Sequence, residues 1–235
     1  MKAERKRGTI MPKIFYIGDS TVAFNKIHTY PQTGMSQSLT LYLKDEVQVI
    51  SLAKNGRSTK SFLDEGRFEP AQQGMGPGDF LLIQFGHNDE KDDPARHTDP
   101  NGSFRDNLRF FIAEARKRGA HPVLITPIAR RHFDEDGIFI PGSHGPYPEA
   151  VRQVGAQEQV PVADLTAPTE AFLAELGDEA SKPLFVWPKD NTHLKADGSV
   201  RMAGFLASEL ERFGDIYAQL LDRGEEVQEQ KSGRG

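Results

Sequence analysis

The clearest indication of the fold is the stretch Lys13-Ile-Phe-Tyr-Ile-Gly-Asp-Ser-Thr-Val-Ala23, KIFYIGDSTVA. Its apolar run stops abruptly at Gly18, Asp19 and Ser20. A short run rich in branched and aromatic residues is typical of a strand that is covered on both faces, as in a parallel sheet. A strand is therefore expected over residues 13–17, with Ser20 just past its end. The question is whether this serine is a nucleophile or caps a helix that follows the strand.

Four further apolar runs predict strands at Val47–Leu52, Asp79–Phe85, His121–Thr126 and Val160–Asp164. Helical patterns separate them, the clearest from a capping box at Ser103 to a stop at Gly119. Another helix is expected from about Asp197 to Phe213, which carries an apolar stripe. Strands that alternate with helices predict an α/β/α sandwich around a parallel sheet of five strands.

Composition limits the classes of function. The chain has 235 residues, of which 37% are hydrophobic and 27% charged, enough for one domain with a full core. A net charge of -5 counts against nucleic-acid binding. The chain has no cysteine, which excludes a disulfide, a thiolate nucleophile and a cysteine-ligated zinc. No apolar run approaches the roughly 20 residues of a membrane span, so no membrane partner is expected.

The two ends of the chain look different from the rest. Residues 1–11 are expected to be a disordered leader and residues 223–235 a disordered tail, which leaves 12–222 as a single domain. The N-terminus is basic, but Pro12 and Lys13 interrupt the apolar segment that a secretion signal requires. The sequence therefore predicts a soluble, cytoplasmic protein.

Polar clusters follow the predicted strands. Because ligands bind at the carboxyl ends of parallel strands, side chains at these positions are expected to meet at one rim of the sheet. The clusters are Asp19 and Ser20 after the first strand, Gly56 and Arg57 after the second, His87 and Asn88 after the third, and Asp190 and His193 before the last long helix.

These residue types fit acyl transfer. A serine such as Ser20 becomes a nucleophile when a neutral imidazole takes its proton, and a carboxylate must orient that imidazole. His193 and Asp190 can supply this pair. The backbone N–H groups of Ser20 and Gly56 and the amide of Asn88 are the expected donors to the oxyanion.

The same residues resemble a known superfamily. The segments GDSTVA, NGRS, FGHNDEK and DNTHL resemble the four ordered blocks of the SGNH (GDSL-like) hydrolases, and most of all those of the rhamnogalacturonan acetylesterases. The resemblance covers the chain from residue 13 to about residue 213. It implies a flavodoxin-like three-layer α/β/α fold and a serine esterase without metal or cofactor. One departure is Gly34-Met-Ser-Gln37, where relatives often have Gly-Trp-Gly-Gln.

The resemblance also implies the roles of residues. Ser20 is carried over as nucleophile, Gly56 and Asn88 as oxyanion donors, and Asp190 with His193 as the rest of the triad. The predicted function is removal of O-acetyl groups from pectin or rhamnogalacturonan-type oligosaccharides through an acyl-enzyme on Ser20.

Three alternatives stay open from the sequence. The first is a short-chain lipase, thioesterase or lysophospholipase of the same superfamily. The second is a saccharide-binding relative without activity. The third is a metal-dependent phosphoesterase that uses Asp19, Asn88, Asp190 and His193 as ligands.

Candidate substrate-binding residues have two interpretations each. His87 lines the cleft or closes its turn, Arg57 holds a uronate or is an ordinary surface charge, and Trp187 stacks on a sugar or anchors its loop. The acidic run from Asp89 to Asp93 is interpreted as a solvated face, and the remaining histidines show no ligand spacing, so no metal site is predicted.

Overall fold

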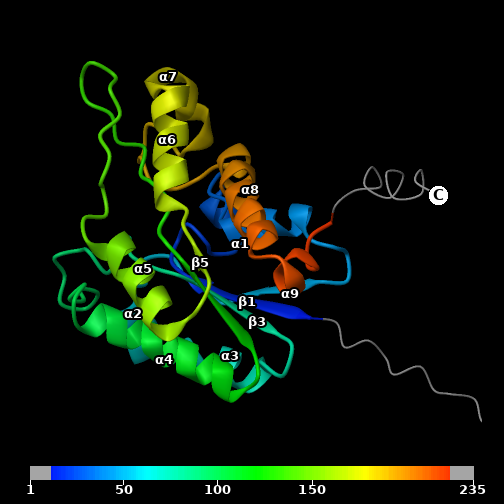
Figure 1. Cartoon of the computed structure of the whole chain (residues 1–235). Coiled ribbons are helices and arrows are strands. Elements are labelled where there is room, and N and C mark those ends of the chain that lie inside the picture. The colour runs from blue at the N-terminus through cyan, green and yellow to red at the C-terminus, as the bar shows by residue number, and fades with distance from the viewer. Residues whose placement is uncertain (1–11, 223–235) are drawn as a thin grey trace, which may run out of the picture.

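The computed structural model describes residues 12–222 and contains a parallel sheet of five strands (Figure 1). The strands are β1 (Lys13–Gly18), β2 (Gln48–Ser51), β3 (Phe80–Gln84), β4 (His121–Ile125) and β5 (Val162–Ala163), arranged in the order β2-β1-β3-β4-β5. Helices cover both faces of this sheet. The predicted α/β/α sandwich with its five parallel strands is therefore confirmed.

Helices α2, α3, α4 and α5 cover one face of the sheet, and α1, α6 and α8 cover the other (Figure 1). The α-helices are α1 (Met35–Ser38), α2 (Thr59–Asp64), α3 (Glu69–Gly74), α4 (Ser103–Lys117), α5 (Tyr147–Glu158), α6 (Thr166–Leu176), α7 (Asp178–Ser181), α8 (Ala196–Phe213) and α9 (Asp215–Ala218). Three 3₁₀ turns are η1 (Ile27–Thr29), η2 (Leu39–Tyr42) and η3 (Lys182–Leu184).

Strand β1 is buried on both faces. Ile14 and Tyr16 pack into the core under α1 and α8, whereas Phe15 and Ile17 pack into the core under α2 and α4. Side chains alternate between the two faces of a strand, so a strand between two helical layers must be apolar throughout. This is the physical reason for the run KIFYI.

Two local predictions need correction. Ser103 does not form a capping box: Gly102 precedes α4 without a side-chain cap, and the Ser103 hydroxyl accepts the Asp99 N–H at 3.0 Å. The fifth strand is shorter than expected, with only Val162 and Ala163. It is one of the two edge strands, and Pro161, which precedes it, has no N–H to donate to a ladder. Helix α8 begins at Ala196 and ends at Phe213, close to its prediction.

The predicted leader (residues 1–11) and tail (residues 223–235) lie outside the described residues. Within residues 12–222, no helix combines the length and apolar character needed to cross a membrane. The cytoplasmic location stays a prediction of the sequence.

Candidate active site

Ser20 lies just beyond β1, in a turn at the carboxyl edge of the sheet. The N–H groups of Val22 and Ala23 donate to the Asp19 carbonyl oxygen at 3.3 and 3.0 Å, which folds the chain back after the strand. The next α-helix begins only at Met35. Ser20 therefore does not cap a helix that follows β1, and that alternative is wrong. The residue is 6% exposed.

The Asp19 carboxylate fixes this turn from inside. Its Oδ1 accepts the Thr21 N–H at 2.9 Å and the Thr21 hydroxyl at 2.8 Å, and its Oδ2 lies 3.3 Å from Nδ1 of His87. Burial raises the pKa of Asp19, but the nearby His87 and the bonds from Thr21 outweigh burial and lower it overall. Asp19 is thus a buried anion that holds the backbone around Ser20.

Asp190 and His193 are brought together by the loop before α8. His193 Nδ1 lies 3.0 Å from Asp190 Oδ2, and the N–H groups of Thr192 and His193 donate to Asp190 Oδ1 at 2.9 and 2.7 Å. Burial raises the pKa of Asp190, yet these bonds outweigh it and hold the pKa below its ordinary value. A carboxylate that accepts from Nδ1 leaves Nε2 of His193 as the basic nitrogen.

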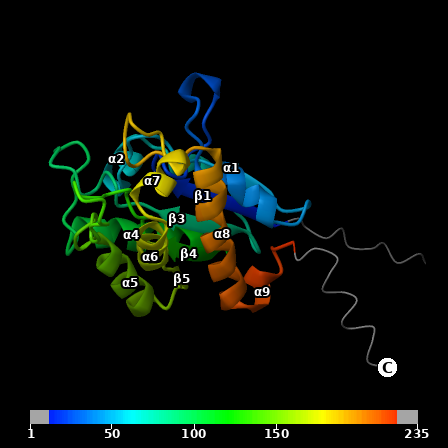
Figure 2. The ribbon, with the colours of Figure 1, turned by 90° about the horizontal axis from the view of Figure 1, so that it is seen from above.

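The loops that carry Ser20 and His193 adjoin (Figure 2, dark blue and orange). Gln32 Nε2 donates to the Ser20 carbonyl oxygen at 3.2 Å, and the N–H of Thr33 donates to the carbonyl oxygen of Leu194 at 2.9 Å. Within the described residues, no hydrogen bond joins Ser20 directly to His193. Catalytic hydrogen bonds are often long without substrate and tighten when substrate binds.

Gly56 and Asn88 lie on the loops after β2 and β3. Gly56 has φ +76°, which favours glycine, and a Cβ at this position would meet no atom within 4 Å, so the space on that side of the residue is open. The amide of Asn88 is oriented from both ends: Nδ2 donates to the Arg57 carbonyl oxygen at 3.1 Å, and Oδ1 accepts from Arg96 Nη1 at 3.3 Å. This leaves a second N–H on Nδ2 for a ligand.

His87 lies beneath the rim. It is 3% exposed, and its ring packs edge-on against that of His144 at 4.3 Å. Burial lowers the pKa of His87 to about 4, with the neighbouring His144 and Arg130 acting in the same direction against Asp19. The structure thus places a neutral imidazole inside the loop after β3, which fits the interpretation that His87 closes the turn and leaves little surface for substrate.

Asp89 belongs to the acidic run predicted to be a solvated face, and this prediction is wrong for Asp89, which is buried. Its Oδ1 accepts the N–H and the hydroxyl of Thr59 at 3.0 and 2.6 Å and the hydroxyl of Thr98 at 3.0 Å. Burial raises the pKa of this carboxyl to about 7. Asp89 connects the loop after β3 to the start of α2 through these bonds with Thr59. Its position within an acidic run in the sequence gives no sign of this structural role.

Arg57 and Trp187 border the site. Arg57 Nε lies 2.8 Å from Glu65 Oε1, and together with Gly56 it lines a cavity of about 360 Å³. Trp187, on the loop before His193, is 40% exposed, and the Arg131 guanidinium lies 4.4 Å from its ring centroid. Arg57 therefore forms an ion pair with Glu65. The Trp187 ring contacts the Arg131 guanidinium and is also partly exposed to solvent.

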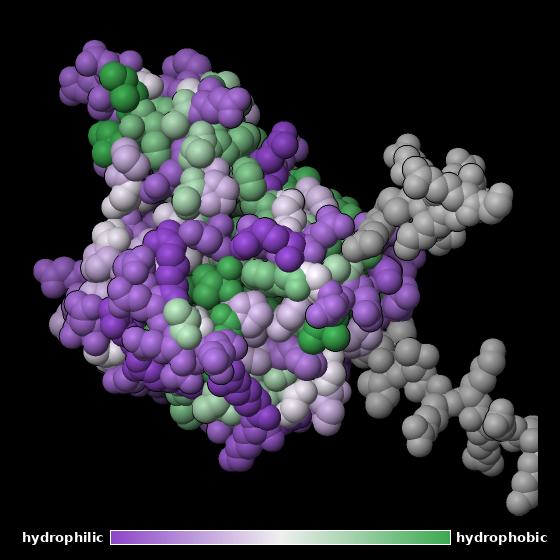
Figure 3. Space-filling model, in the orientation of Figure 1, coloured by the Kyte–Doolittle hydropathy of each residue, from purple (hydrophilic) through white to green (hydrophobic). Residues whose placement is uncertain are grey.

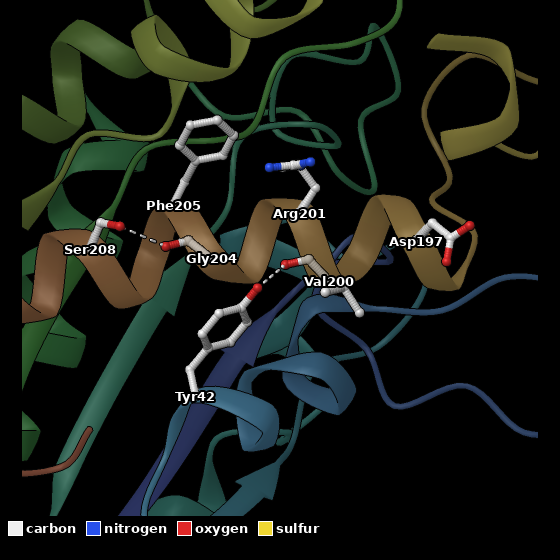
Figure 4. A pocket seen from close by; sticks show the side chains of 7 residues that line it. All are labelled: Tyr42, Asp197, Val200, Arg201, Gly204, Phe205 and Ser208. Carbon is white, nitrogen blue, oxygen red and sulfur yellow. Dashed lines mark hydrogen bonds between the residues drawn. The ribbon is translucent and has the colours of Figure 1, made fainter. Parts of the chain in front are cut away.

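Other surface features lie away from these residues. A groove of about 600 Å³ runs over the outer face of α8, lined by Tyr42, Asp197, Val200, Arg201, Gly204, Phe205 and Ser208 (Figure 4). None of the predicted site residues lines it. Ile138, in the loop between β4 and α5, is exposed, and Figure 3 shows small hydrophobic areas among hydrophilic ones near the tip of this loop. Residues 12–222 contain no cluster of three or more histidine, cysteine or acidic side chains that could hold a metal.

Comparison with known proteins gives consistent matches. Residues 16–201 match the GDSL-like lipase/acylhydrolase family. Rhamnogalacturonan acetylesterase RhgT of Bacillus subtilis is 39% identical over 214 residues, 86% of this chain and 90% of that protein. The probable rhamnogalacturonan acetylesterase YesY of the same organism is 38% identical over 205 residues, 86% of this chain and 93% of that protein.

A solved structure also resembles this chain. The crystal structure of the YxiM protein of Bacillus subtilis superposes with a TM-score of 0.77 at 26% identity. The match covers 86% of this chain and 57% of that one, so this chain spans little more than half of that protein.

Proposed function

Because the chain belongs to the GDSL-like lipase/acylhydrolase family, we propose that it removes acetyl groups from carbohydrate through an acyl-enzyme on Ser20. The matches confirm the resemblance to SGNH hydrolases and rhamnogalacturonan acetylesterases, and the chain is a carboxylic ester hydrolase. The residue roles, the acyl-enzyme and the pectic substrate belong to the proposal.

One observation carries the proposal. A serine at the end of the apolar strand β1 lies at the same edge of the sheet as a histidine whose Nδ1 is held by a carboxylate at 3.0 Å. This pairing is the arrangement that nucleophilic acyl transfer by serine requires. Gln32 and Thr33 connect the two loops that carry these groups.

In the proposed reaction, Nε2 of His193 takes the proton of the Ser20 hydroxyl as the oxygen attacks the acetyl carbonyl carbon. His193 then gives this proton to the departing sugar hydroxyl, which leaves an acetyl ester on Ser20. Water, deprotonated by the same imidazole, attacks this ester, and the imidazolium returns the proton to the Ser20 oxygen as the acyl bond breaks. Acetic acid leaves and ionises to acetate in solution. Asp190 stays ionised and stabilises the imidazolium in both steps.

Three donors are assigned to the oxyanion of the tetrahedral intermediate: the N–H groups of Ser20 and Gly56 and the free N–H of Asn88 Nδ2. The open space around Gly56 supports this assignment, as does the amide orientation that Arg57 and Arg96 impose on Asn88. Donors fixed in advance stabilise the developing charge without reorganising at the moment of reaction.

The substrate class rests on the relatives and on two side chains. Two relatives that share 39% and 38% identity with this chain carry the name rhamnogalacturonan acetylesterase. Arg57 lines a cavity beside Gly56, where its guanidinium can receive the carboxylate of a uronic acid. Trp187 offers a partly exposed ring to a sugar. We therefore assign acetylated pectic oligosaccharides as substrates, with Arg57 and Trp187 as contacts.

The deciding experiment compares wild type, Ser20→Ala and the control Ser208→Ala on p-nitrophenyl acetate, butyrate and octanoate. Ser208 is an exposed serine on α8 whose hydroxyl donates to the Gly204 carbonyl oxygen of the same helix at 3.0 Å, so its variant should match wild type. Ser20→Ala should lose activity on all three esters. An active Ser20→Ala would refute the acyl-enzyme, and a preference for octanoate would favour a lipase-like activity.

The polysaccharide class needs its own measurement. Acetate release from acetylated rhamnogalacturonan oligosaccharides is expected to exceed release from acetylated xylo-oligosaccharides. The opposite order would overturn the pectic assignment and leave the esterase mechanism in place. Activity is expected to survive a chelator, whereas a metal-dependent phosphoesterase would lose it.

A further inference from the structure

The Arg130 guanidinium joins the two sides of the candidate site. Its Nη1 donates to the Thr192 hydroxyl at 2.7 Å, and its Nη2 donates to the His87 carbonyl oxygen at 3.2 Å. Thr192 immediately precedes the base His193, and His87 immediately precedes the oxyanion donor Asn88. The planar guanidinium of Arg130 therefore bridges two loops, the one that carries the base and the one that carries the oxyanion donor.

Arg130 is itself held by a partly buried acid, Glu90. Glu90 accepts from Arg130 through Oε1, and its Oε2 lies 2.9 Å from Nδ1 of His144. The side chains of Arg130 and Glu90 are each 15% exposed. Burial raises the pKa of Glu90, but His144 and Arg130 outweigh burial and lower it overall, so Glu90 is an anion between two donors.

The His144 ring fixes the far end of this chain of contacts. Its Nε2 lies 2.8 Å from the Ile128 carbonyl oxygen, which can only accept, and its Nδ1 faces the Glu90 carboxylate. Both ring nitrogens thus face oxygen atoms, which fixes the orientation of the ring. The His144 side chain is fully buried, and its ring also packs against that of His87.

We propose that Arg130 is a positioning residue for ester hydrolysis, which sets the separation between Asn88 and His193, and that Glu90 and His144 hold its guanidinium in place. This inference rests on the proposed function, because it takes His193 as the base and Asn88 as an oxyanion donor. It assigns no contact between Arg130 and the substrate. A planar guanidinium has donors at fixed angles and can bridge two acceptors, whereas an ammonium group acts as a point charge.

The test compares Arg130→Ala and Arg130→Lys with the control Arg118→Ala, using p-nitrophenyl acetate. Arg118 is also partly buried and paired with a carboxylate, Glu114, but it lies at the C-terminal end of α4, away from the site. Arg130→Ala should lower kcat roughly 100-fold with little change in KM, because a displacement of about 1 Å costs that much. Arg130→Lys should retain only part of the wild-type kcat, and Arg118→Ala should have the wild-type kcat.

Chemical rescue of Arg130→Ala distinguishes a positioning role of Arg130 from a role in protein stability alone. Millimolar guanidinium chloride should raise kcat of Arg130→Ala several-fold and leave wild type and Arg118→Ala unchanged, while methylammonium chloride should have no such effect. An unchanged kcat in Arg130→Ala, or a loss that guanidinium does not relieve, would overturn the proposal. An active Ser20→Ala would instead refute the proposed function on which it rests.

Discussion

At the scale of single residues, the Asp190 carboxylate has two separate tasks. Its Oδ1 accepts two backbone N–H groups of its own loop, and its Oδ2 accepts from the ring of His193. The first task shapes the loop and the second selects the tautomer of the base. An asparagine can keep the first task through its amide oxygen, but it presents an NH₂ group to Nδ1.

Asp190→Asn is therefore expected to leave the fold intact and to lower kcat by roughly 10⁴-fold, because Nδ1 must then accept and Nε2 carries the proton. Steady-state kinetics on p-nitrophenyl acetate and a thermal melt measure the two effects. A variant that retains wild-type kcat would contradict the role given to Asp190.

Arg57 provides a second prediction for single residues. Arg57→Gln removes the guanidinium beside Gly56 and should raise KM for uronate-containing oligosaccharides about tenfold, the effect of losing roughly 1.4 kcal/mol of binding. Hydrolysis of the uncharged p-nitrophenyl acetate by the same variant is the internal control and should be unchanged. An equal loss on both substrates would argue for a structural role, through the contact with Glu65.

Part of the site was predictable and part was not. The polar clusters after β1, β2 and β3 were placed at one edge from strand order alone, since parallel strands share their carboxyl ends. Glu90 and His144 were missed because they are 54 residues apart in the chain and meet only through tertiary packing. His144 lies in a long loop, where no periodic pattern in the sequence predicts which residue its ring contacts.

At the scale of secondary-structure elements, the end of β1 decides where Ser20 lies. Strand positions followed from apolar runs, because a strand buried on both faces must be apolar. The start of α4 did not follow from its capping pattern, since Ser103 bonds the preceding turn at Asp99. Apolar runs in the sequence thus predicted where the strands lie. Hydrogen bonds of neighbouring residues, such as that between Asp99 and Ser103, determine how each helix begins.

Gly18 tests this end of β1. A Cβ on Gly18 would lie 2.5 Å from the Gln84 carbonyl oxygen and 2.9 Å from Val22 Cγ2. Gly18→Ala should therefore lower the free energy of unfolding by about 1–3 kcal/mol and reduce activity, because the strain lies beside Ser20.

Gly76→Ala is the matched control, because a Cβ there meets no atom within 4 Å. It should be neutral or stabilising by up to about 1 kcal/mol. Urea denaturation measures both variants. Equal stability of the two would show that the backbone moves to accept the methyl group at Gly18.

At the scale of the whole molecule, buried ionisable groups under the rim link stability to pH in opposite directions. His87 has its pKa lowered to about 4, and Asp89 has its pKa raised to about 7. Between pH 4 and pH 7, His87 is mostly neutral in the folded protein, whereas an ordinary histidine in the unfolded chain binds a proton over much of this range. Asp89 is mostly protonated in the folded protein over the same range, whereas an ordinary aspartate in the unfolded chain is ionised. The stability of the wild type alone therefore cannot isolate either group.

His87→Gln isolates the first contribution, because glutamine carries an N–H that can face Asp19 but does not titrate. An ordinary histidine has a pKa of 6.5, so between pH 6.5 and 4 the unfolded wild type binds more protons than the folded protein. As pH falls through this window, wild type should lose about 3 kcal/mol of unfolding free energy relative to His87→Gln, from 1.36 kcal/mol per pKa unit. Urea denaturation of both proteins at pH 7, 5.5 and 4 measures this difference. A difference that stays constant with pH would mean that His87 takes up its proton in the folded protein as readily as in the unfolded chain.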